Sequence, residues 1–314
     1  MNATNEAHPV LLCFDGSEGA KQAITVAGAL GVSGEAVVCT SWRGLSHVMF
    51  RGTLGVVPPP LAKAIDELDE LDRQAAEKLA GDGVALAQAA GFRAVPAAIK
   101  QDDKAWRMLL ATAAERRARL IVVGAHGCSG MERVLLGSVS SAVLTRAHAP
   151  VLVVPDSPDT GAHDGPLLLC YDGSEGARHA IEVAGELFPD RSASVVSLWK
   201  SWVAHAAVPA LAGVGPVVGM KVELDEIAEA QSQEIATEGV ALAVEAGLIA
   251  EPLPSRVIGA PIWRGVIDAA DDQGAAAIVM GSRGLTGISA ALGSVSHGVV
   301  HHSRLPVLVV PPTS

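Results

Sequence analysis

Aromatic side chains are scarce in this sequence. They make up 3% of the 314 residues and include a single tyrosine, while hydrophobic residues as a whole reach 49%. The hydrophobic content is ample for packed cores, but these cores must be built from alanine, valine, leucine and isoleucine. The length is too great for one ordinary small domain, which favours two domains.

Positive charge is also in short supply. The chain has 23 Lys and Arg residues against 34 Asp and Glu residues, which gives a formal net charge of -11. Such a surface repels nucleic-acid backbones and anionic membranes, and no basic run or aromatic-studded basic strip offsets it. We therefore expect no nucleic-acid partner and no membrane partner.

Cysteine is rare and shows no CxxC spacing. The four residues are Cys13, Cys39, Cys128 and Cys170, and we expect mostly buried, reduced thiols, as in a cytoplasmic protein. A redox role for Cys128, which lies in a glycine-rich stretch, stays open as an alternative. The N-terminal sequence MNATNEAHPV lacks the charged start and apolar core of a signal peptide, which also favours the cytoplasm.

One long stretch, residues 201–220, has no charged residue. A membrane span is the alternative interpretation, but two prolines and three glycines interrupt the stretch and no second span accompanies it. We expect an apolar loop instead. Residues 43–60 occupy the corresponding place in the first half, and either loop could close over a ligand or present an apolar surface to a protein partner.

The chain repeats itself. DGSEGA occurs at 15–20 and 172–177, GVALA at 83–87 and 239–243, and PVLVVP at 150–155 and 306–311. An offset of 156 or 157 relates the copies, so the protein consists of two homologous halves. We predict domains over residues 1–155 and 166–314, joined by a polar linker over 156–165 that is rich in Asp, Pro and Gly.

Each half alternates short apolar runs with longer helical segments. In the first half, strands are predicted over 10–14, 36–42, 94–99, 120–123 and 151–154, and helices over 16–31, 61–91, 103–118 and 137–149. Almost uniformly hydrophobic strands are typical of parallel sheets that helices cover on both faces. The predicted fold class is therefore α/β, with two tandem doubly wound domains of five parallel strands each. In the long helix, helical spacing places these residues on one apolar face: Leu61, Ile65, Leu68, Leu71, Ala75 and Leu79.

The stretch GAHGCSGMERVLLGSVS, residues 124–140, follows the fourth predicted strand. Glycines bring bare backbone N–H groups close to a ligand, and a helix start leaves several N–H groups unpaired. Together they form an anion site, which we assign to Gly124, Gly127, Gly137, Ser138 and Val139, and in the second half to Gly281, Gly284, Gly293, Ser294 and Val295. No lysine follows as in a Walker-type loop, and a plain tight turn remains the alternative. We expect Val139, Ala142 and Val143 on the inward face of the helix.

Each first strand ends in an aspartate, Asp15 and Asp172, followed by Gly-Ser. A carboxylate at this edge of a parallel sheet could accept hydrogen bonds from a ribose or a base. It could equally cap the helix that follows, since Asp, Gly and Ser all suit that position. The local sequence leaves both interpretations open.

Taken together, these residues resemble the universal stress protein family. The early aspartate, the G-x2-G-x9-G-S spacing at Gly124, Gly127, Gly137 and Ser138, and the closing PVLVVP carry the resemblance over nearly the whole chain. It implies a Rossmann-like fold of strand order 3-2-1-4-5 that binds adenine nucleotides. The implied nucleoside contacts are Asp15 and Asp172, and the implied adenine contacts lie near Thr40–Ser41 and Ser197–Leu198. The glycine and Gly-Ser positions are implied to hold the phosphates.

The resemblance also implies ATP as the ligand, with ADP or AMP as alternatives and Mg2+ bound through the phosphates. No dedicated general base is evident, so we expect a stress-response sensor rather than a fast ATPase, with slow hydrolysis left open. The alternative is a nucleotide-independent interaction scaffold. The PVLVV strands suggest an intrachain pseudo-dimer of the halves, with a homodimer as a second choice and the protein partner unknown.

The halves depart from the family pattern in different ways. The second glycine loop is one residue shorter, which predicts a shifted helix start or a shorter turn before it. The first half carries Gln101-Asp102-Asp103 where the second has Gly259-Ala260-Pro261, and acidic side chains there would oppose phosphates. We therefore expect non-equivalent sites.

Several histidines have spacings that need interpretation. His126 lies in the first glycine loop where the second has Arg283, and we expect a solvated side chain rather than a phosphate ligand. His297, His301 and His302 include an i,i+4 pair that could bind zinc, but we expect them to point to solvent.

Overall fold

The computed structural model describes residues 8–44, 59–101, 103–127, 136–156, 163–201, 215–284 and 292–313. The chain divides into two compact units, Met1–Ser157 and Pro158–Ser314. The boundary falls inside the polar segment that the sequence assigns to the linker. The predicted pairing of the two halves through their PVLVV strands stays a prediction.

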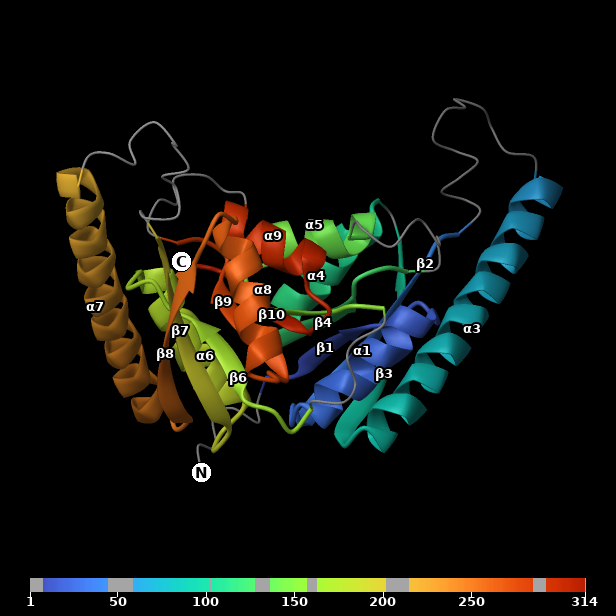
Figure 1. Ribbon diagram of the computed structural model, residues 1–314. Coiled ribbons are helices and arrows are strands. Elements are labelled where there is room, and N and C mark those ends of the chain that lie inside the picture. Colours follow the sequence, from blue (N-terminus) through green and yellow to red (C-terminus); the bar gives the residue numbers. More distant parts are fainter. Residues whose placement is uncertain are drawn as a thin grey trace. The chain divides into compact units, whose positions relative to one another are not determined.

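The first unit alternates strands and helices along the chain (Figure 1). Its strands pair in the order β3-β2-β1-β4-β5, and every pair is parallel. This is the order 3-2-1-4-5 that the resemblance implies. The elements are β1 Val10–Cys13, α1 Glu18–Ala29, β2 Gly34–Trp42, α3 Pro59–Ala89, β3 Phe92–Lys100, α4 Ala105–Glu115, β4 Leu120–Gly124, α5 Ser138–Arg146 and β5 Val151–Val154.

The second unit repeats this arrangement. Its strands pair in the order β8-β7-β6-β9-β10, again all parallel. The elements are β6 Leu167–Cys170, α6 Glu175–Leu187, β7 Ser192–Lys200, α7 Gly215–Glu245, β8 Ile249–Val257, α8 Ile262–Asp272, β9 Ala277–Gly281, α9 Ser294–His302 and β10 Val307–Val310. The predicted doubly wound α/β class is confirmed for both halves.

The strand order reverses direction between the first and fourth strands of each unit. Because crossovers between parallel strands are right-handed, the helices before and after the reversal lie on opposite faces of the sheet. Accordingly α1 packs beside α3 and α4 beside α5, while α6 packs beside α7 and α8 beside α9. Helices on both faces explain why β4, β5, β9 and β10 are buried at every position. The reversal also leaves a crevice at the carboxyl ends of the strands, where such folds bind ligands.

The two long helices begin earlier than the sequence suggested. Helix α3 starts at Pro59, and α7 starts at Gly215 with Pro216 in its first turn, where the missing N–H of proline costs nothing. The prediction of a loop over 201–220 is therefore wrong for residues 215–220. Residues 202–214 and 45–58, the rest of the two predicted loops, lie outside the described residues. Within the described part of the chain, no helix is both long and apolar enough to cross a membrane.

Helical spacing identified the long helix but misjudged part of its buried face. Ile65 is 3% exposed as expected, whereas Leu68 and Leu71 are 46% and 60% exposed. Alanines 76, 80 and 87 fill the buried face instead, because a small side chain lets the helix lie close to the sheet. On α5 the buried residues are Ser140, Val143 and Leu144, so the predicted inward positions of Val139 and Ala142 are wrong.

Two glycines allow close contacts between neighbouring helices. A Cβ on Gly28 of α1 would lie 2.3 Å from the carbonyl oxygen of Ala90, just after α3. The second unit repeats this contact at Gly185 of α6, where a Cβ would lie 2.2 Å from the carbonyl oxygen of Ala246. In contrast, Gly81 of α3 faces open space, with nothing within 4 Å of a Cβ.

The same substitution, glycine to alanine, should have opposite effects on stability at Gly28 and at Gly81. Gly28→Ala should lower the melting temperature, because overpacking against backbone costs about 1–3 kcal/mol. Gly81→Ala should raise it, because alanine is about 1 kcal/mol better than glycine in a helix interior. Thermal unfolding followed by circular dichroism measures both. Equal shifts for the two variants would contradict the assigned contact.

Candidate functional site

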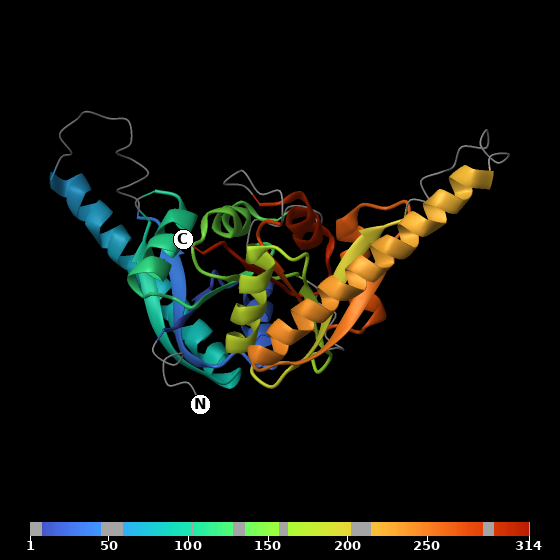
Figure 2. The same ribbon diagram turned by 90° about the vertical axis from the view of Figure 1, so that its left-hand side faces the viewer.

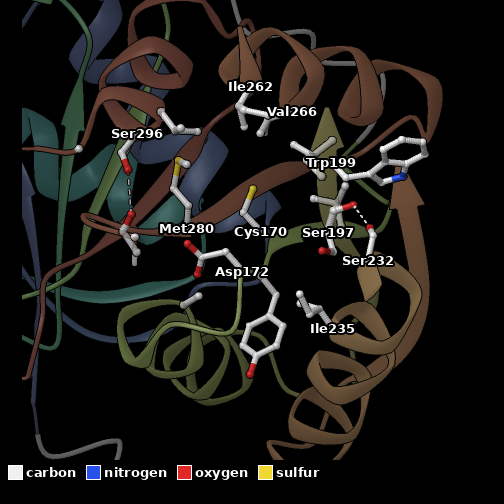
Figure 3. A pocket seen from close by; sticks show the side chains of 18 of the residues that line it. Cys170, Asp172, Ser197, Trp199, Ser232, Ile235, Ile262, Val266, Met280 and Ser296 are labelled. Carbon is white, nitrogen blue, oxygen red and sulfur yellow. Dashed lines mark hydrogen bonds between the residues drawn. The ribbon is translucent and has the colours of Figure 1, made fainter. Parts of the chain in front are cut away.

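A cavity of about 500 Å³ lies at the carboxyl ends of the strands of the second unit. Its volume is in the range of small-molecule sites. All seven residues that the sequence singled out in this half line it: Asp172, Ser197, Gly281, Gly284, Gly293, Ser294 and Val295. They come from the ends of β6, β7 and β9 and from the start of α9, so segments far apart in sequence meet here (Figure 3).

Asp172 follows the end of β6, and its carboxylate points into the cavity (Figure 3). Its Oδ1 accepts a hydrogen bond of 3.0 Å from the backbone N–H of Ser174. The helix cap itself is Ser174, whose Oγ accepts from the N–H of Ala177. The sequence left capping open for the aspartate, and the structure assigns it to the serine. The second carboxylate oxygen of Asp172 lies toward the glycine loop.

The glycine loop approaches this aspartate so closely that no side chain fits between them. A Cβ on Gly284 would lie 2.6 Å from Oδ2 of Asp172, far inside van der Waals contact. A Cβ on Gly281 would lie 2.8 Å from the carbonyl oxygen of Gly176, in the first turn of α6. Gly281 therefore requires glycine, whereas a side chain at Gly284 would have to displace the Asp172 carboxylate. The loop backbone lies directly beside that carboxylate.

The start of α9 is held against the end of β9. The N–H of Gly293 donates to the carbonyl oxygen of Ser282 at 2.8 Å, and Oγ of Ser296 donates to the carbonyl oxygen of Gly281 at 2.9 Å. Gly293 is the N-cap and provides no capping side chain, so the first N–H groups of α9 have no side-chain acceptor there. Ser294 and Val295 line the cavity at this point, where a helix start favours an anion.

The first unit places its predicted residues in the same relationships. A Cβ on Gly127 would lie 2.5 Å from Oδ2 of Asp15, and one on Gly124 would lie 2.8 Å from the carbonyl oxygen of Gly19. Gly137 is again the N-cap, ahead of Ser138 at the start of α5 and the half-exposed Val139. Residues 128–135 of this loop, with Cys128 and its proposed redox role, lie outside the described residues.

The missing residue of the second loop does not shift the helix start, which leaves the shorter turn of the two predicted alternatives. Gly137 donates to the carbonyl oxygen of Ala125 at 2.8 Å, as Gly293 does to Ser282. Oγ of Ser140 donates to the carbonyl oxygen of Gly124 at 2.7 Å, which matches the bond made by Ser296. The shortening therefore falls within residues 285–291, which lie outside the described residues.

The negative charge expected at residues 101–103, which would oppose bound phosphates, is also smaller than the sequence suggested. Asp103 pairs with Arg107 one turn further along α4, so its charge is balanced locally. Gln101 is 7% exposed, and Asp102 lies outside the described residues. The described side chains of residues 101–103 therefore carry no unbalanced negative charge.

The end of the second strand reaches the cavity in the second unit. Ser197 lines it and is 4% exposed, and its carbonyl oxygen accepts a hydrogen bond of 2.9 Å from Oγ of Ser232 on α7 (Figure 3). Its counterpart in the first unit is Thr40, which is buried and donates to the carbonyl oxygen of Phe14 at 2.9 Å. Ser41, the residue singled out there, is half-buried and corresponds to Leu198.

The sequence analysis did not predict two further walls of the cavity. Helix α7 contributes Ala228, Gln231, Ser232 and Ile235, while α8 contributes Ile262 and Val266. Together with Cys170, Val196 and Met280 they make part of the lining apolar (Figure 3). The spacing of 228, 232 and 235 is that of one helix face, but only the fold reveals which face meets the cavity.

The titratable groups beneath the cavity favour their neutral forms. Burial, and to a smaller extent the charge of Asp172, raises the pKa of the Cys170 thiol to about 12, so this cysteine is not an activated nucleophile. Burial also raises the pKa of Tyr171 to about 12, helped by the hydrogen bond of 2.6 Å that its hydroxyl donates to Glu238. Phe14 occupies the position of Tyr171 in the first unit.

Two of the histidines are less exposed than the sequence suggested. Nδ1 of His126 lies 2.7 Å from Oδ2 of Asp156, and its side chain is 18% exposed, so the expectation of a solvated side chain is wrong. His297 and His302 are exposed as expected, and the His302 ring also stacks on Trp263 with ring centroids 4.4 Å apart. His301 is only partly exposed, and its ring lies 4.1 Å from that of His297. Among the described residues, no group of three His, Cys, Asp or Glu side chains could hold a metal ion.

Comparison with known proteins identifies a family whose members are similar to this chain in sequence. The model of the universal stress protein family matches residues 6–155 and 165–311. A universal stress protein of Mycolicibacterium smegmatis is 30% identical over 207 residues, and one of Mycobacterium tuberculosis is 31% identical over 201 residues. These matches cover 63% and 61% of this chain, and the chain spans only 64% and 61% of the length of the two relatives.

Solved structures share the fold over almost the full length. A universal stress protein from Archaeoglobus fulgidus superimposes with a TM-score of 0.58 at 19% identity, covering 98% of this chain and all of that one. A protein of Pseudomonas aeruginosa described as functionally unknown gives 0.55 at 18% identity, covering 99% of this chain and 95% of that one. At such identities the likeness concerns the fold alone.

The single tyrosine allows a direct test of the cavity floor. Because the neutral phenol is favoured in the folded protein, its stabilisation is complete below pH 10 and is lost as the pH rises from 10 towards 12. Tyrosinate absorbance should reach half its full value near pH 12 in the folded protein and near pH 10 in urea. Glu238→Gln should lower the folded midpoint by removing a negative charge. A midpoint near 10 in protein with native circular dichroism would refute the assignment.

Proposed function

The chain belongs to the universal stress protein family, and from this premise we propose that it binds an adenine nucleotide, with ATP as the preferred ligand. Nucleotide occupancy would let it act in the cytoplasm as a sensor or regulatory module of the stress response. One observation carries the proposal: the cavity of the second unit joins a carboxylate, a bare glycine backbone and a helix start in one lining.

The two parts of the lining suit the two parts of a nucleotide. The glycine loop and the start of α9 offer backbone N–H groups and a positive helix end, which favour phosphates. Ile235, Ile262 and Val266 form an apolar region that would hold the base, and Asp172 would accept hydrogen bonds from the ribose. The matching contacts of Asp15, Gly127 and Gly137 support a second site of the same kind in the first unit.

Binding without rapid chemistry fits the described residues best. Among the described lining residues, the Cys170 thiol is not an activated nucleophile, since it stays protonated at neutral pH. Hydrolysis also requires a base held beside the attacking water. Slow hydrolysis stays the alternative in the first unit, because a histidine beside a carboxylate, as His126 is beside Asp156, can act as such a base. We propose that any Mg2+ arrives with the phosphates, because its preferred ligands are oxygens and several water molecules.

The helix start allows the proposal to be tested with a matched pair of variants. Gly293→Asp should weaken ATP binding by at least about a hundredfold, because it places a carboxylate among donors meant for an anion. Gly293→Ala adds only a Cβ, whose nearest neighbour is the carbonyl oxygen of Ser282 at 3.3 Å, and should change the affinity by less than about threefold. Isothermal titration of nucleotide-free protein with Mg-ATP gives both values.

The equivalent pair in the first unit separates the two sites. Gly137→Asp and Gly137→Ala change the same geometry, with the carbonyl oxygen of Ala125 also 3.3 Å from the added Cβ. Each Asp variant should remove one of the binding events seen with the unaltered protein and leave the other. Unchanged titration curves for both Asp variants would rule out phosphate binding at these helix starts.

A further inference from the structure

Helix α7 exposes apolar side chains on its outer surface. Leu224 and Ile227, one helical turn apart, are 39% and 62% exposed. With 31 residues the helix is about 46 Å long, whereas the nine residues of β8 span about 30 Å. Helix α7 therefore extends past the strands that it packs against in its own unit (Figures 1 and 2).

The described side chains of α7 carry charge of one sign. Residues 223–245 contain seven acidic residues and no Lys, Arg or His. Asp225 is buried against Ser201, and Glu238 pairs with Arg178. The remaining exposed carboxylates have no ion-pair partner among the described residues: Glu223, Glu226, Glu229, Glu234 and Glu245. Like charges three or four residues apart on a helix repel each other, so this surface carries unbalanced negative charge.

The first unit provides an internal comparison. Helix α3 carries the same exposed apolar pair, Leu68 and Leu71, but its own cations offset part of its acidic charge. Arg73 pairs with Glu70 at 2.6 Å and also contacts Glu77. An offset of 156 aligns Arg73 with Glu229 and Lys78 with Glu234. The second unit has therefore kept the apolar pair and replaced the balancing cations with further acids.

We propose that this surface, formed by Glu223, Leu224, Glu226, Ile227, Glu229 and Glu234 and here called the α7 face, is a docking site for a cationic amphipathic helix of a partner protein. The apolar side of such a helix would cover Leu224 and Ile227, and its Lys and Arg residues would supply the missing ion pairs. A second copy of this chain fits less well, because two α7 faces would bring like charges together.

Helix α7 also contributes to the proposed nucleotide site. Ala228, Ser232 and Ile235 line the cavity of the second unit, and Ala228 follows Leu224 by one helical turn on the same side of the helix. Docking itself requires no nucleotide. Gly293→Asp changes the start of α9 and none of the residues of the α7 face. This variant can therefore lose nucleotide binding and still bind the partner helix, which distinguishes failure of the nucleotide proposal from failure of this one.

The test uses the full-length protein and a fluorescently labelled synthetic helix of leucine and lysine with all leucines on one face. Fluorescence anisotropy should show saturable binding. Leu224→Gln combined with Ile227→Gln should weaken it by at least about tenfold, because the two side chains would no longer bury apolar surface against the peptide. Leu68→Gln combined with Leu71→Gln, the matched change on α3, should alter it by less than about twofold. Circular dichroism verifies that both variants are folded.

Four results would overturn the proposal. The first is the absence of saturable binding to the unaltered protein, and the second is an equal loss for the α3 and α7 variants. The third is equal binding of a scrambled peptide of the same composition, which would mean that charge alone is recognised. The fourth is a self-association, seen by sedimentation, that the α7 variant abolishes, which would make a second copy the occupant.

Discussion

The site depends on one steric constraint, the lack of space for a side chain between the glycine loop and the aspartate that ends the first strand. A Cβ at Gly284 would collide with Asp172, and one at Gly281 would collide with the backbone of Gly176. Both contacts join the end of the fourth strand to the start of the helix after the first. Because the loop lies so close, the carboxylate, the bare backbone and the start of α9 border one cavity. The first unit obeys the same constraint at Gly127 and Gly124.

The sequence predicted the scaffold more fully than the surfaces. Strands such as 151–154 were found to the residue because helices bury both of their faces, which leaves an unbroken apolar run. Helical spacing, in contrast, does not reveal which residues a neighbour covers. The spacing of Leu68 and Leu71 therefore did not show that both are exposed. The contribution of α7 to the cavity and the bond from Ser296 to Gly281 depend on tertiary contacts between distant segments. The repeated GSVS was the one available signal for Ser296.

The two halves show which features the duplication preserved and which it changed. The helix–helix contacts at Gly28 and Gly185, the serine caps and the glycine loops are the same in both. Other positions differ between the halves. The first half has Phe14 and Arg73 where the second has Tyr171 and Glu229. Exposed positions such as that of Glu229 can acquire new partners. The buried position of Tyr171 keeps the aromatic ring of Phe14, because packing leaves little room for change, and adds a hydroxyl that bonds Glu238. The halves therefore share their backbone arrangement and differ in the polar and charged side chains that they carry at corresponding positions.

Identification of the resident ligand tests the central claim, adenine-nucleotide binding, most directly. Full-length protein purified without added nucleotide would be denatured by heat, and the released small molecules separated by chromatography and identified by mass spectrometry. The account predicts ATP or its hydrolysis products, or, if the protein is isolated empty, saturable binding when ATP is added. Protein that releases no adenine nucleotide and binds none on titration would contradict it.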